Sequence, residues 1–158
     1  MAQPYRLAAL LKLRERAREE AEQDLARAQS AQTKAQRHLE AAQSFEQDCR
    51  AKVEEAKAKL YEGTDLTIGK IQTREAFVKR LQAEREQAQD EVEHCEKLLQ
   101  QAQEEVRQAN AVLIQTKQDE EALLKHREKW EREQKTIQRR REEDEADDIA
   151  QTLWRRKK

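Results

Sequence analysis

The side chains best suited to chemistry in this sequence are two cysteines, Cys49 and Cys95, and three histidines, His38, His94 and His126. Thiols and imidazoles act as nucleophiles, general bases or metal ligands only where the fold brings them together. The histidines are far apart, no CxxC pair occurs, and the adjacent His94 and Cys95 do not face each other on a helix. The sequence also lacks a Gly-rich phosphate loop. We therefore expect a protein that is not an enzyme, with no catalytic residue, metal site or cofactor.

The composition favours long helices over any fold that needs many turns. The 158 residues are 41% charged, 36% hydrophobic and 4% aromatic, with two glycines and one proline. Sandwiches, barrels and α/β folds need more turn residues and strand-forming runs, and disordered chains are richer in Pro, Ser and Gly. The abundant Ala, Glu, Gln, Lys, Arg and Leu are good helix formers. The sequence predicts an all-α protein.

The charge balance and the hydropathy pattern narrow the class of partner. Thirty-two Lys and Arg face 33 Asp and Glu, for a net charge of −1, whereas nucleic-acid binders are usually basic or carry a basic face. No apolar run approaches the roughly 20 residues that span a bilayer, and the first residues do not resemble a signal peptide. We expect a cytoplasmic protein that binds no nucleic acid, does not insert into a membrane, and keeps its cysteines reduced.

Both glycines lie within residues 63–69, the one segment that reads as a turn. Gly63 can adopt the left-handed conformation that ends a helix, and Asp65 or Thr67 can cap the next helix. Pro4 suits the first turn of a helix because its missing N–H has no partner there. We therefore expect one elongated coiled-coil domain over residues 1–158, with a helix over about 4–62, a turn at 63–69 and a second helix over about 70–154.

Both predicted helices carry a coiled-coil seam that alternates large and small apolar residues. The rows of the first helix are Leu11, Arg18, Leu25, Gln32, Leu39, Glu46, Val53 and Leu60, and Leu7, Arg14, Ala21, Ala28, Ala35, Ala42, Cys49 and Ala56. The rows of the second are Val78, Arg85, Val92, Leu99, Val106 and Leu113, and Leu81, Ala88, Cys95, Ala102 and Ala109. Such rows predict knobs-into-holes packing, and a short turn makes the helices antiparallel. The expected fold is an antiparallel two-helix coiled-coil hairpin.

Folding about residue 65 places residue i roughly opposite residue 130 − i, so the longer second helix overhangs the first beyond about residue 126. In this register Cys49 and Cys95 lie roughly 20 Å apart along the helix axis, too far for a disulfide. The polar seam residues, such as Arg14 and Glu46, have two interpretations. They fix the register at a cost in stability, or they mark places where packing is loose.

The few aromatic residues indicate possible interfaces. Phe45 lies beside the seam, and Tyr61 and Phe77 flank the turn. With Leu66, Ile68, Val78 and Leu81, these rings either cover the hairpin tip or form a docking patch.

The overhang carries its own apolar and charged residues. Trp130 continues the seam past the first helix, so it packs against the N-terminal leucines or meets a partner. Trp154 is too far along the chain to reach those leucines. The basic run Arg139, Arg140 and Arg141 precedes an acidic segment, and the last four residues are basic. This pattern fits an exposed single helix or a helix end that enters a charged ring on a partner.

The layout resembles a known family. A Leu-rich start at residues 7–15, Ala/Gln/Glu-rich heptads, one central turn, Trp130, an Arg/Gln-rich stretch and the acidic residues 142–148 are together similar to the FliJ/YscO family. Its members are central stalk proteins of flagellar and virulence type III secretion ATPases. The acidic segment after the Arg run is the most specific feature of the resemblance.

The resemblance implies a mechanism and two binding sites. The end with both termini would sit in the pore of the hexameric ATPase and promote its assembly and activity, and the turn end would reach the cytoplasmic ring of the export gate. Some members also bind secretion chaperones. By position, the implied gate-binding residues are Phe45, Phe77 and Leu81, while Cys49 stands where flagellar members can carry another aromatic residue. The overhang, with Trp130, Arg139, Arg140, Arg141 and Trp154, would face the ATPase.

The main alternative is a structural scaffold or adaptor with no role in secretion. If residues 63–69 stayed helical or extended, one open helix could dimerise through the same seam.

Overall fold

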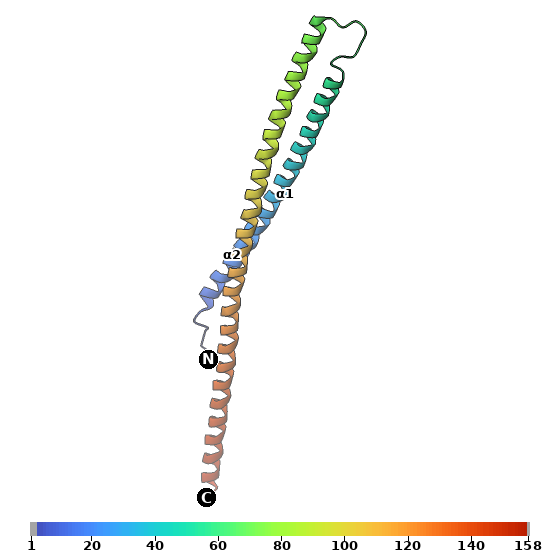
Figure 1. The fold of residues 1–158 in the computed structure, drawn as a ribbon. Coiled ribbons are helices and arrows are strands. Elements are labelled where there is room, and N and C mark those ends of the chain that lie inside the picture. The colour runs from blue at the N-terminus through green and yellow to red at the C-terminus, as the bar shows by residue number, and fades with distance from the viewer. Residues whose placement is uncertain (1–2, 158) are drawn as a thin grey trace. The chain divides into compact units, whose positions relative to one another are not determined.

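The computed structural model describes residues 3–157 and contains two long α-helices within them (Figure 1). Helix α1 spans Ala8–Ala58 and helix α2 spans Ile68–Arg156, with 51 and 89 residues. The described residues contain no strand. The prediction of an all-α, antiparallel helical hairpin with a longer second helix is confirmed. The alternative of one open chain, with residues 63–69 helical or extended, is wrong, because α1 and α2 contact each other within the same chain.

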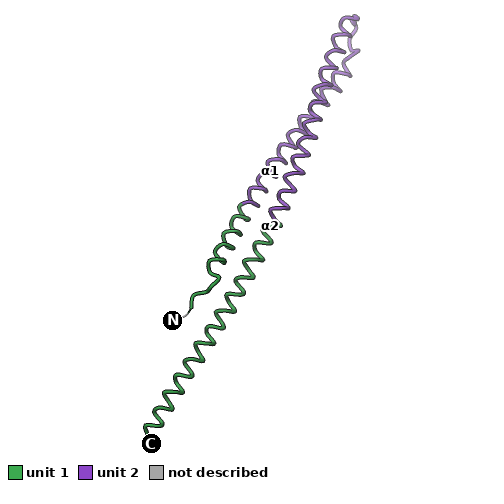
Figure 2. The backbone as a smooth tube through the Cα atoms, turned by 90° about the vertical axis from the view of Figure 1, so that its left-hand side faces the viewer, with its two compact units in different colours: residues 1–23, 111–158 green, residues 24–110 purple. Residues whose placement is uncertain are grey.

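The chain divides into two compact units, which are shown in different colours in Figure 2. Unit 1 combines Met1–Gln23 with Ala111–Lys158, and unit 2 is Asp24–Asn110. Each unit therefore takes one segment from α1 and one from α2.

Unit 2 is built on the predicted seam. Its buried residues alternate between larger side chains and small ones on both helices: Leu39, Cys49, Val53, Val78, Leu81, Ala88, Cys95 and Ala102. Val53 is the most completely enclosed of them, with no exposed surface. Both cysteines are free and buried, in agreement with the expectation that they lie too far apart to form a disulfide. They serve as small apolar side chains that let the two helices approach closely.

The turn of unit 2 follows the expected chemistry with shifted helix bounds. Gly63 has a φ of 113°, the left-handed conformation that favours glycine. The hydroxyl of Thr67 accepts a hydrogen bond from the N–H of Lys70 at 3.2 Å, which makes Thr67 the N-cap of α2. Helix α2 therefore starts at Ile68 rather than 70. Helix α1 ends at Ala58 rather than 62, because the backbone then tightens into i to i+3 hydrogen bonds.

Unit 1 pairs the start of α1 with the middle of α2. Its buried seam residues are Leu11, Ala21 and Leu113. Helix α1 begins at Ala8 rather than 4, since residues 6 and 7 form a turn and the N–H of Ala8 bonds the carbonyl of Tyr5 at 3.2 Å. Cross-helix contacts between Tyr5 and His126 and between Arg14 and Asp119 lie close to the predicted register.

Candidate partner-binding site

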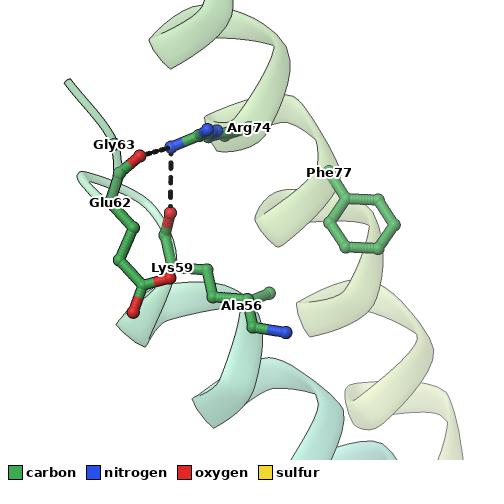
Figure 3. Close-up of a pocket in the computed structure, with 6 residues that line it drawn as sticks. All are labelled: Ala56, Lys59, Glu62, Gly63, Arg74 and Phe77. Carbon is green, nitrogen blue, oxygen red and sulfur yellow. Dashed lines mark hydrogen bonds between the residues drawn. The ribbon is translucent and has the colours of Figure 1, made fainter. Parts of the chain in front are cut away.

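One arginine closes the loop end of unit 2. Arg74, in the second turn of α2, donates from Nη1 to the carbonyls of Lys59, Leu60 and Glu62 at 3.0, 3.2 and 2.7 Å. These carbonyls follow the end of α1, where backbone acceptors have no partner within the helix. A cation is also favourable near the helix C-terminus. Arg74 points into the loop, whereas the ring of Phe77 points away from it (Figure 3).

Phe77 stands at the edge of two shallow hollows at this end of unit 2. One hollow, of about 550 Å³, is lined by Ala56, Lys59, Glu62, Gly63, Arg74 and Phe77 (Figure 3). The second, which we call the tip groove, is lined by Lys52, Glu55, Ala56, Lys59, Phe77 and Leu81. The ring is 45% exposed, and the guanidinium of Arg80 lies 5.0 Å from its centroid. This cation–π contact is made to one face of the ring, and the ring remains partly exposed.

The residues that line the tip groove show which positions of α1 and α2 lie on the same side of unit 2. Lys52, Lys59 and Phe77 each directly precede a seam residue, and all three line this groove. Positions that precede seam residues on α1 and α2 therefore face the same side of the pair. Phe45, which precedes the seam residue Glu46, occupies the same kind of position and is 59% exposed.

The three residues predicted to bind at the turn end differ in exposure. Phe77 and Leu81 line the tip groove together, but Leu81 is 8% exposed and belongs to the seam. Leu81 can support the floor of the groove and offers little surface of its own. Phe45 lines neither hollow beside Phe77. Val78 is likewise buried in the seam, so it does not extend an exposed aromatic patch as the sequence suggested.

A longer apolar groove continues along this side of unit 2. It encloses about 640 Å³ and is lined by Ala31, Lys34, Ala35, His38, Ala41, Ala42, Glu91, His94, Cys95 and Leu98. Leu98 is exposed there, and it precedes the seam residue Leu99. Leu98 was not among the residues expected at an interface, although its position directly before a seam residue is the signal that could have identified it.

Two further grooves of unit 2 are lined mainly by polar residues. One is lined by Gln43, Glu46, Gln47, Arg50, Gln89, Val92, Glu93 and Glu96, and another by Gln29, Gln32, Thr33, Gln36, Arg37 and Glu40. Unit 2 thus presents an apolar side, with Phe45, Phe77 and Leu98, and a polar side rich in glutamine. An interface that excludes water is better served by the apolar side.

Unit 2 also contains a buried carboxylate in its seam. Glu46 accepts a hydrogen bond from Arg50 on the same helix at 3.0 Å and lies 3.7 Å from Nε of Arg85 on α2. The Nε atom of Arg85 is itself buried. Because the carboxylate is compensated from both helices, this polar seam position favours the register-fixing interpretation over loose packing.

The Cys95 thiol is buried in the same seam. Burial raises its pKa above the ordinary value, and so does Glu91, whose carboxylate accepts a hydrogen bond from Sγ at 3.6 Å. A thiol held in its protonated form is a poor nucleophile. Cys95 therefore has the character of a packing residue.

In unit 1, the ring of Tyr5 packs on Trp130, a contact that was not expected from the sequence. The ring of Tyr5 lies 5.3 Å from that of Trp130 and 5.8 Å from that of His126. A hydrogen bond of 2.7 Å also joins the Tyr5 hydroxyl to Nδ1 of His126. Trp130 is half-buried as a result. Tyr5, which lies just before α1, thus contributes a covering ring in addition to any contact with the N-terminal leucines.

The polar seam residues of unit 1 also form cross-helix ion pairs. Arg14 contacts Asp119 at 3.3 Å, and Arg18 binds both Glu120 on α2 and Glu22 on its own helix. The Glu120 side chain is largely buried, so its pairing with Arg18 matters more than a surface pair would. These contacts are specific to one alignment of α1 and α2 within the unit.

Helix α2 continues beyond Ile137 with its residues exposed to solvent. Every residue from 138 to 157, which we call the terminal segment, is exposed. It contains Arg139, Arg140 and Arg141, of which Arg139 lies 3.9 Å from Glu143, and Trp154, which is 61% exposed. The predicted ATPase-facing residues therefore fall into two groups. Trp130 is packed by Tyr5, while the three arginines and Trp154 lie on the exposed helix.

Neither a metal site nor a membrane-spanning helix is present in the part of the chain that the structure describes. The described residues contain no cluster of three or more His, Cys, Asp or Glu side chains that could hold a metal ion. Neither described helix has a stretch long and apolar enough to cross a membrane.

Comparisons with known proteins identify a family and a shared fold. A family model described as YscO-like protein matches residues 2–158. A solved structure from Chlamydia trachomatis, described as that of a candidate YscO homolog, superimposes with a TM-score of 0.81 at 21% sequence identity. The match covers 96% of this chain and 94% of that one, and it shows a shared fold. No curated protein matches the chain significantly in sequence.

Proposed function

The chain belongs to the YscO-like family, and from that premise we propose that it acts in type III secretion as the central stalk of the hexameric export ATPase. In this role the protein works in the cytoplasm, at the periphery of the inner-membrane secretion apparatus. It catalyses no reaction. It promotes assembly and activity of the ATPase, links it to the export gate, and offers a surface to secretion chaperones.

The observation that carries this proposal is the terminal segment of α2. Helix α2 runs on to Arg156, and every residue from 138 to 157 is exposed, so this length of helix offers its surface to another protein. Its basic and acidic runs suit the narrow, charged lining of a protein ring, where opposite charges set orientation and register. This end is the one that the resemblance to the FliJ/YscO family assigns to the ATPase.

The apolar side of unit 2 supports the second half of the proposal. Exposed aromatic residues on an otherwise polar helical pair are typical of interface anchors. Phe77, held by Arg80 beside the tip groove, and Phe45 on the same side are the residues we assign to the export gate, with Leu81 as support. The groove that contains Leu98 lies on this side as well and is available to a chaperone.

A pair of variants tests the two ends separately. The first is truncated after Ile137, which keeps Tyr5, His126 and Trp130 in place and removes the terminal segment. We expect it to bind the gate ring normally and to lose stimulation of ATP hydrolysis and of hexamer formation by the cognate ATPase.

The second variant is the matched control, with Phe45→Ala and Phe77→Ala. We expect it to stimulate the ATPase like the intact chain and to lose gate binding, because a few anchoring side chains carry most of the binding energy of an interface. Full stimulation by the truncated chain would refute our assignment of the ATPase contact. If the intact chain neither binds nor stimulates the ATPase, the scaffold or adaptor alternative becomes the better explanation.

A further inference from the structure

The end of α2 carries an apolar stripe that does not continue the seam. Trp130 and Ile137 follow the seam of unit 1, but Ile149 and Leu153 come next, at 62% and 54% exposure. At 3.6 residues per turn, Leu153 lies about 160° around the helix from Ile137 and Ile149 about 120°. The stripe formed by Ala146, Ile149, Ala150 and Leu153 therefore faces away from the side that packs on α1.

The charges on either side of this stripe are separated by sign. Residues 142–145, 147 and 148 are acidic, and Arg155, Arg156 and Lys157 are basic, with six uncharged residues between the two groups. Charges pair along one helix at separations of three or four residues, and these two groups are at least seven apart. Within the described chain, Glu145, Asp148 and Arg155 form no ion pair.

From this arrangement we propose that residues 142–157 form an antiparallel helical pair with the same segment of a second copy of the chain. Antiparallel alignment brings the acidic half of one copy opposite the basic end of the other, and a two-fold axis makes each contact occur twice. A parallel pair would instead place like charges side by side. Because the acidic half of the segment is complementary to its own basic end, a second copy of the chain is the partner that best fits the stripe.

The heptad spacing fixes the register of this pair. Ala146, Ile149 and Leu153 are separated by three and four residues, as coiled-coil seam positions are. With the two-fold axis near residue 151, Ile149 of one copy packs on Leu153 of the other. Glu143 then lies opposite Lys157 of the second copy, and Ala150 lies close to its own counterpart.

The contact involves about four turns of helix from each copy, which places it among small and weak interfaces. The pair should therefore form reversibly as concentration rises and weaken with salt. It covers the helix end that we assign to the ATPase, so under the proposed function a chain in the dimer is unable to occupy the ring. The dimer itself does not depend on that function.

Sedimentation equilibrium of the full chain, from low micromolar to millimolar concentration, tests the proposal without any ATPase. Glu143→Lys alone and Lys157→Glu alone should each weaken dimerisation about tenfold, because two attractive pairs become repulsive. The double variant should restore it. Lys135→Glu, outside the segment, is the control and should leave the dissociation constant unchanged. A monomer at every concentration, or a double variant no better than the single ones, would overturn the proposal.

Cysteine crosslinking tests the orientation. In a background with Cys49→Ala and Cys95→Ala, Ala150→Cys should form an intermolecular disulfide readily, since residue 150 lies near the two-fold axis. Ala146→Cys should not, because it lies opposite the other end of the partner segment. Efficient crosslinking at residue 146 would indicate a parallel pair and contradict the proposed arrangement.

Discussion

Arg74 is the side chain that joins the two helices of unit 2 at their connection. It donates to the carbonyls of Lys59, Leu60 and Glu62 beyond α1. Its removal takes this donor from all three, and the Lys59 carbonyl keeps only its bond from the N–H of Glu62. We expect Arg74→Leu to lower the free energy of unfolding by about 1 to 2 kcal/mol, because hydrogen bonds from a charged donor are stronger than neutral ones and these are partly exposed. Chemical denaturation of the full chain measures this change.

Lys79→Leu serves as the control for Arg74→Leu, because Lys79 is exposed on the same helix. Hydrogen exchange adds a local test. Amides of residues 55–62 should exchange faster in Arg74→Leu and at the normal rate in Lys79→Leu. Equal stability of both variants would show that the cap contributes nothing.

The Cys95 thiol gives a prediction that depends on pH. Its pKa is raised by burial and by Glu91, so the folded state binds the proton more tightly than the unfolded state. The resulting stabilisation is fully present below the pKa of the unfolded thiol and is lost as the pH rises through that of the folded thiol. We expect Glu91→Gln, which keeps the shape and removes the charge, to lower the pKa of Cys95 and speed its alkylation at alkaline pH. Peptide mass spectrometry would follow the rate at Cys95 separately from Cys49; an unchanged rate would show that Glu91 has no influence.

At the scale of the helices, the seam was predictable because it depends on periodicity. Val53, Val78 and Leu81 are buried where the heptads placed them, and the turn forms where Gly63 permits a positive φ. The seam and the turn both depend on residues that are close together in the sequence. The contacts of Tyr5 with Trp130 and of Arg74 with Lys59 join residues far apart in sequence, and only the folded chain reveals them. Sequence reasoning singled out Phe45 and Phe77, which are exposed, but not the exposed Leu98, and it did not separate buried Leu81 from its exposed neighbours.

The polar seam of unit 2 makes a prediction about helix pairing. Glu46→Leu leaves Arg85 partly buried without its carboxylate, so we expect the free energy of unfolding to fall by about 2 kcal/mol. Adding Arg85→Leu removes the unpaired charge and places two apolar residues in the seam. The double variant should therefore be at least as stable as the original chain, as measured by thermal and chemical denaturation. A double variant that is less stable than the original chain would mean that the polar contact itself contributes net stability here.

At the scale of the whole molecule, the two units differ in how their chain segments are connected. Unit 2 is one continuous stretch, Asp24–Asn110, with its own turn and its own buried seam. Unit 1 draws on two separate stretches of chain, which covalent connection keeps at a high effective concentration. This connectivity predicts that unit 2 forms without unit 1, whereas the pairing in unit 1 needs the intervening chain.

We therefore expect a fragment of residues 24–110 to fold alone, with the helical circular dichroism of a coiled coil and a cooperative thermal transition. Two peptides covering 3–23 and 111–157, mixed at micromolar concentration, should not associate, because their few buried residues must offset the full entropy of bringing two chains together. Val53→Asp within the fragment is the control, since a charge at a fully buried position should abolish the transition. If the fragment is unfolded while the full chain is helical and cooperative, the seam of unit 2 is too weak alone and stability is shared along the entire length of α1.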